Sequence, residues 1–119
     1  MKAFKSLCLF AVVALAAFSG AQTAEEQRQA QQSIADAIKI YRDTQDADSA
    51  KKAFEELNRK YPSNTDVQAW LGFLYLRTKE PEKAVPLLEQ AAQARSRDAD
   101  IRNNLGNAYL ETGQADKAF

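Results

Sequence analysis

The chain has 119 residues with 16 basic and 16 acidic side chains, so its formal net charge is zero, and it contains no histidine. A balanced charge without a basic stripe argues against a nucleic-acid partner, because nucleic-acid-binding domains typically carry such a stripe. The absence of histidine removes the Ser-His and Cys-His nucleophile systems and the commonest ligand of transition metals. We therefore expect a non-enzymatic protein without a metal or a cofactor.

The first 21 residues have the pattern of a secretory signal peptide. Lys2 and Lys5 precede an apolar run that extends to Phe18, and small residues stand three and one positions before Gln22. The apolar stretch 7–21 has 15 residues, whereas a membrane-spanning helix needs roughly 20. We predict a cleaved signal peptide over 1–21, an exported protein that is periplasmic or secreted, and no stable membrane span after cleavage. A retained membrane anchor is the alternative.

Cleavage of this leader would also change the composition. The single cysteine, Cys8, lies within the leader, so the mature chain would depend on helix packing without any disulfide. Removal of Lys2 and Lys5 leaves 14 basic against 16 acidic residues, a net charge of −2. The segment 22–30 that follows is rich in Glu and Gln, and we expect it to be an exposed leading helix or a linker.

Apolar residues at helical spacing then predict a series of helices. We expect them near residues 25–44, 47–60, 65–78, 81–95 and 99–112, with another that begins near Gln114. Local punctuation supports these boundaries. Pro62 disfavours helix at the residue before it, and Asn64 or Thr65 can cap the next helix. Pro81 suits the first turn of a helix, and Gly113 suits the turn after one.

A repeat of 34 residues relates these helices to one another. Leu71-Gly72 with Tyr75 recurs as Leu105-Gly106 with Tyr109, an offset of 34. An alanine follows each tyrosine by nine residues. Each copy of such a unit has an apolar face that it can bury only against a neighbour. We expect the glycine to permit a close approach between the two helices of a copy.

An earlier and weaker copy precedes these two. Tyr41 and Ala50 stand 34 residues before Tyr75 and Ala84, and Ala37-Ile38 occupies the place of Leu-Gly. The last copy stops at Phe119, about five residues into its second helix. From this we expect a fragment of a longer protein; the alternative is a last helix supplied by a partner or by a second copy.

The spacing resembles the tetratricopeptide repeat family, whose helix–turn–helix unit carries Leu-Gly-x-x-Tyr in its first helix and a small residue in its second. The resemblance implies an all-α helix–turn–helix repeat solenoid of about two and a half repeats, incomplete at its C-terminus. The division would be a degenerate repeat at 31–64, a repeat at 65–98 and a partial repeat at 99–119.

The resemblance also implies a function, because partner peptides of this family commonly lie in the concave groove lined by the first helix of each repeat. Within that groove, the residues expected to bind a protein or peptide partner are Trp70, Phe73, Arg77, Asn103, Asn104 and Asn107. Other expected groove residues are Asp66, Ala69, Leu76 and Asp100, with Asp36, Lys39 and Arg42 from the first copy.

Several alternatives remain open at this point. Trp70 could instead pack in the core against Phe54 and Leu57. The protein could be a self-associating module, a homo-oligomer joined through the ends of the array, instead of an adaptor for an envelope or secretion complex. It could also be the targeting domain of a longer enzyme. Within these residues the acidic pairs Glu25-Glu26 and Glu55-Glu56 diverge by about 100° around a helix and are interpreted as solvated surface.

Overall fold

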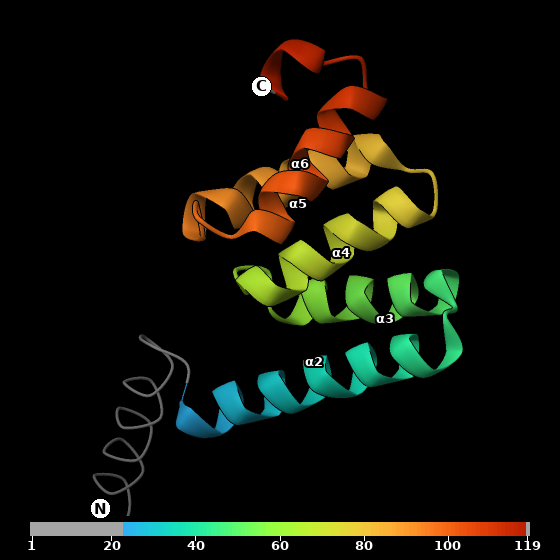
Figure 1. Ribbon diagram of the computed structural model, residues 1–119. Helices are drawn as coiled ribbons and strands as arrows, with labels where there is room; N and C mark the ends of the chain where they lie inside the picture. Colours follow the sequence, from blue (N-terminus) through green and yellow to red (C-terminus); the bar gives the residue numbers. More distant parts are fainter. Residues whose placement is uncertain (1–22, 119) are drawn as a thin grey trace, which may run out of the picture.

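The computed structural model describes residues 23–118, which fold into five α-helices and one short 3₁₀ helix, and this part of the chain contains no strand. The elements, in chain order, are α2 (Ala24–Thr44), α3 (Ala47–Lys60), α4 (Thr65–Arg77), α5 (Pro81–Ala94), α6 (Ala99–Glu111) and η1 (Ala115–Lys117). Successive helices reverse direction and stack from α2 to α6 as a series of helical hairpins (Figure 1). Each helix packs against the next, and α4 also contacts α6. The predicted all-α repeat solenoid is confirmed.

Polar side chains begin four of the five helices. Thr23 and Glu26 form a capping box at the start of α2, in which each side chain binds the backbone N–H of the other residue. Asp46, Asn64 and Asp98 accept N–H groups in the first turns of α3, α4 and α6. These caps satisfy backbone donors that would otherwise lack an acceptor in the helix. They explain why the helices begin within one residue of the predicted positions.

The 34-residue period is also written into the backbone of the turns. Gln45, Lys79 and Gly113 follow the first helix of each copy, and all three adopt a left-handed conformation, with φ of 55°, 65° and 75°. The threonine hydroxyls near these turns donate to the carbonyl four residues earlier, at Thr44, Thr78 and Thr112. Only one of the three left-handed positions is glycine, the residue that adopts this conformation without steric cost.

The core lies between α3, α4 and α5, where the largest fully buried side chains are Phe54, Val67, Leu71, Leu74 and Leu88. Helices α4 and α5 approach closely at Gly72. A Cβ atom at this position would lie 2.6 Å from Cγ of Leu88, so only glycine fits there. The expected close approach at Gly72 is therefore present. At the equivalent Gly106, no atom lies within 4 Å of the same construction.

The helix boundaries agree closely with those predicted, except at the C-terminal end. A helix was expected to begin near Gln114, whereas residues 115–117 form a 3₁₀ turn with i→i+3 hydrogen bonds from Lys117 to Gln114 and from Ala118 to Ala115. Such tighter turns are favoured in short pieces, where few α-helical bonds can form. The predicted signal peptide at 1–21 lies outside the described residues. Among residues 23–118, no helix is both long and apolar enough to cross a membrane.

Candidate partner-binding pocket

A pocket of about 460 Å³ lies between α4, the C-terminal end of α5 and the N-terminal half of α6. The side chains that line it are Asp66, Ala69, Trp70, Phe73, Arg95, Asp98, Asp100, Ile101, Asn103 and Asn104. Helix α4 contributes one wall, because its residues 66, 69, 70 and 73 share one face at a spacing of three to four. Helix α6 contributes the facing wall. A pocket of this size is within the range of small-ligand and peptide sites.

An aromatic cluster holds the floor of the pocket in place. The Trp70 ring stacks on Phe54 at 5.8 Å with an interplanar angle of 14°, and it meets Phe73 at 5.8 Å and Tyr41 at 6.1 Å in edge-on arrangements. Phe54 and Tyr41 are buried, whereas Trp70 and Phe73 are half-buried and line the pocket. Trp70 therefore packs on Phe54, as the core alternative predicts, and also presents surface to the pocket.

An ion pair closes one side of the pocket. Nη1 of Arg95 lies 2.7 Å from Oδ1 of Asp66, and this hydrogen bond raises the pKa of the Arg95 guanidinium. Both side chains are close to half exposed, so the pair itself stabilises the fold only weakly. Its main consequence is positional, because it ties the end of α5 to the start of α4.

The start of α6 brings carboxylates to the same pocket. Oδ1 of Asp98 accepts the backbone N–H groups of Asp100 and Ile101, which fixes the Asp98 carboxylate at the helix N-terminus. The Asp100 side chain is exposed and Ile101 is buried. The rim of the pocket is thus acidic, and its inner side is apolar.

The pocket brings together four of the six residues expected to bind a partner: Trp70, Phe73, Asn103 and Asn104. Asn103 is exposed and Asn104 is half-buried on α6. The other two, Arg77 and Asn107, are exposed on α4 and α6 and do not line this pocket. Both lie nearer the C-terminal ends of these helices, beyond the acidic rim.

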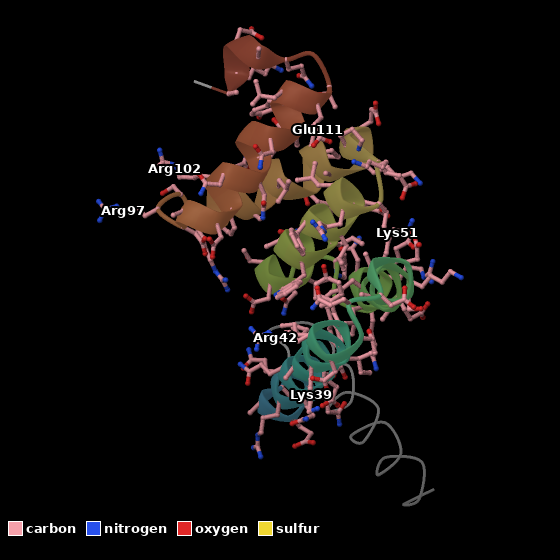
Figure 2. The ribbon with its side chains drawn as sticks, turned by 45° about the vertical axis from the view of Figure 1, so that its right-hand side comes forward. Lys39, Arg42, Lys51, Arg97, Arg102 and Glu111 are labelled. Atoms are coloured by element: carbon pink, nitrogen blue, oxygen red, sulfur yellow. The ribbon has the colours of Figure 1, made fainter. Side chains whose placement is uncertain are left out.

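The expected contributions from the first copy lie elsewhere. Asp36, Lys39 and Arg42 are exposed on α2 and are not part of the pocket. Figure 2 shows Lys39 and Arg42 on α2, at the opposite end of the array from Arg102 on α6. Nζ of Lys39 instead pairs with Asp43 at 2.6 Å along the same helix.

Three lining residues were missed by the sequence analysis: Arg95, Asp98 and Ile101. The 34-residue offset could have found two of them, because Asp98 occupies the place of the capping Asn64, and Ile101 that of the buried Val67. Arg95 had no such signal, because its equivalent is Tyr61. Its place follows from the tertiary contact with Asp66.

Comparison with known protein families agrees with this architecture. A tetratricopeptide repeat family profile matches residues 35–96, which is more than half of the chain, and a second tetratricopeptide repeat profile matches residues 79–118. The chain belongs to the tetratricopeptide repeat family. No curated protein matches the sequence.

Solved structures with the same architecture include two of MamA. A mutant form of MamA has a TM-score of 0.66 and 29% identity, covering 72% of this chain and 49% of that chain. MamA MSR-1 C2 has a TM-score of 0.61 and 31% identity, covering 66% of this chain and 45% of that chain. The chain therefore spans about half the length of these structures.

Membership of this family identifies the chain as a protein–protein interaction module, since repeat solenoids present extended concave surfaces to partners. Tetratricopeptide repeat scaffolds are typically non-enzymatic. In residues 23–118 no group of three His, Cys, Asp or Glu side chains is arranged to hold a metal ion.

Proposed function

We propose that this chain is an adaptor that binds an extended segment of a partner protein in the pocket between α4 and α6. The observation that carries the proposal is the joint presence of half-buried Trp70 and Phe73 on one wall and of Asn103 and Asn104 on the other. Tryptophan is enriched among residues that dominate binding energy at protein interfaces.

The two walls suit the two parts of an extended peptide. A carboxamide such as that of Asn104 offers both a donor and an acceptor, which matches the alternating C=O and N–H groups of a peptide backbone. The aromatic wall can accept apolar side chains, because the rings of Trp70 and Phe73 are already ordered by the cluster and lose little freedom on binding.

Selection from a random peptide library, followed by affinity measurements on variants, tests this proposal. Phe73→Ala and Asn104→Ala are each expected to weaken a selected peptide by about tenfold, the loss that corresponds to one good contact of 1.4 kcal/mol. Asn107→Ala is the matched control, because Asn107 lies on α6 outside the pocket, and it should leave the affinity unchanged. Equal affinities for all three variants would place the binding surface elsewhere.

We further propose that the adaptor acts outside the cytoplasm, in assembly of an envelope or secretion complex. The support for this is the leader-like sequence at 1–21. Cell fractionation of the full chain tests it. Recovery of a shortened chain in the envelope or medium is expected, and retention there should be abolished when aspartates interrupt the apolar run. An uncut cytoplasmic chain would contradict this role.

Self-association is a second candidate, favoured by one observation. Ile40 on α2 and Leu110 on α6, near opposite ends of the array, are 58% and 50% exposed. Stacking of these ends between chains would cover both side chains. Sedimentation velocity over a range of concentrations distinguishes the two functions, because Ile40→Lys and Leu110→Lys should each abolish association if the ends stack. A monomer at all concentrations would exclude this candidate.

A further inference from the structure

From the charges and rings that line the pocket, we infer that its ligand is a peptide that presents a basic side chain, arginine or lysine, to the acidic rim beside Trp70. This inference rests on the proposed function and specifies the chemistry of the partner. It depends on three features of the pocket, which are its net charge, the engagement of its single cation and the position of its tryptophan.

The charged residues of the pocket are unbalanced. Its walls carry three aspartates, Asp66, Asp98 and Asp100, and one arginine, Arg95, a net formal charge of −2. The Arg95 guanidinium is engaged by Asp66 at 2.7 Å, so this pair contributes no net charge to the pocket. The whole negative excess therefore comes from Asp98 and Asp100 at the start of α6.

The partners of these two aspartates in the fold are neutral. Asp98 accepts backbone N–H groups of Asp100 and Ile101, which orient its carboxylate without removing its charge. The nearby arginines of the α5–α6 corner, Arg97 and Arg102, do not line the pocket, and Figure 2 shows their side chains extending outward from the helices. A ligand that enters the pocket thus meets two carboxylates with no cation of their own among the lining residues.

Trp70 adds a second, independent preference for a cation. An arginine or lysine over the face of an aromatic ring is attracted by the negative potential of the ring, and tryptophan gives the strongest such interaction. Both the ring and the carboxylates line one pocket. Arginine can satisfy both at once, because its planar guanidinium stacks on a ring while its N–H groups donate to carboxylates.

Acidic peptides are disfavoured by the same features. A ligand carboxylate placed near Asp98 and Asp100 would experience like-charge repulsion, and the one cation of the pocket is already paired with Asp66. The specificity predicted for this pocket is therefore for basic peptides over acidic ones. This preference is a property of the third copy, because the equivalent of Asp98 in the second copy is the neutral Asn64.

Fluorescence titration tests the inference, since Trp70 is the only tryptophan of the chain and reports directly on its own surroundings. The probes are three capped hexapeptides, Ala-Leu-X-Leu-Ala-Ala, in which X is arginine, citrulline or glutamate. Citrulline keeps the shape and most of the hydrogen-bonding groups of arginine but lacks its charge. We expect the arginine peptide to bind about tenfold more tightly than the citrulline peptide and the glutamate peptide to bind most weakly.

Charge-matched variants locate the effect. In the double variant Asp98→Asn with Asp100→Asn, the preference for arginine over citrulline should fall to about twofold or less, while asparagine at 98 retains the capping ability of the residue. Glu111→Gln is the control, because it removes one negative charge from the far end of α6, outside the pocket (Figure 2). It should leave the preference intact. Added salt should reduce the preference in the parent chain as charges are screened.

The failure of this inference and that of the proposed function are distinguishable. Equal affinity for the three hexapeptides overturns the inference and leaves peptide binding in the pocket standing. The same conclusion follows if none of them binds but the peptide library yields binders without a basic residue that depend on Asn104. Absence of any binder from both the hexapeptides and the library overturns both proposals. Enrichment of arginine or lysine among library peptides supports the inference.

Discussion

Alanine in place of Gly72 tests the close packing of α4 against α5 on which the position of Trp70 depends. The new Cβ atom would lie 2.6 Å from Cγ, 2.8 Å from Cδ2 and 3.3 Å from Cδ1 of Leu88. Leu88 is fully buried, so its branched carbon has no free space into which it could move. Either the two helices separate or Leu88 leaves its rotamer, and overpacking of this kind costs about 1–3 kcal/mol.

Gly106 supplies the matched control for this variant. It holds the equivalent position in α6, and a Cβ atom there meets nothing within 4 Å. Glycine to alanine inside a helix is by itself favourable by about 1 kcal/mol, and this gain is shared by both variants. Their difference therefore isolates the cost of the clash with Leu88. We expect Gly106→Ala to be more stable than the parent chain, and Gly72→Ala to be less stable than Gly106→Ala by about 1–3 kcal/mol.

Urea unfolding followed by circular dichroism at the helical band measures both variants against the parent chain. For a domain of this size, 1 kcal/mol corresponds to a change in melting temperature of about 4–8 °C, so heating gives an independent readout. Equal stability of the two alanine variants would refute the close approach of α4 and α5 at Gly72.

Further predictions concern a turn, an ion cluster and the aromatic floor. Lys79→Gly should raise the free energy of unfolding by about 1 kcal/mol in the same urea assay, because Lys79 has a φ of 65° that costs a side chain but not glycine. Glu80 accepts hydrogen bonds from Lys51 at 2.8 Å and from Lys83, which lower its pKa to about 2. Because the pKa of Glu80 is below its ordinary value of 4.5 in the folded state, its contribution is present above pH 4.5 and is lost as the pH falls toward about 2. Acid titrations monitored by circular dichroism should therefore show a weaker loss of stability over this range in Lys51→Met than in the parent chain. Trp70→Ala should lower the melting temperature as well as peptide affinity, since the ring stacks on a buried phenylalanine, whereas Trp70→Phe should retain most of the fold.

The helices and their boundaries could be predicted from the sequence because they depend on local signals. Asn64 caps α4 and Pro81 begins α5 where the sequence predicted them. The 34-residue period, read from Leu71-Gly72 and Tyr75, also identified the close contact at Gly72, because a repeated glycine at one position of a helix has a packing reason.

The composition of the pocket could be predicted only in part. Trp70 and Asn104 were expected there because each lies on the first helix of a copy, on the face that the family resemblance assigns to the groove. Arg95 enters the pocket through its contact with Asp66, 29 residues away in the chain, which no periodicity encodes. The dual environment of Trp70 could not be decided either, because helical spacing gives a face but not the depth to which a ring is covered.

The measurement that tests the central claim most directly is a two-dimensional ¹⁵N NMR titration of the chain with a library-selected peptide. The chain has a single tryptophan, so its indole N–H gives one resonance that can be assigned from composition alone. We predict that this resonance shifts together with the side-chain amides of Asn103 and Asn104, while the amides of α2 remain unchanged. Saturating peptide that leaves these three side chains unshifted and perturbs another surface would contradict the account.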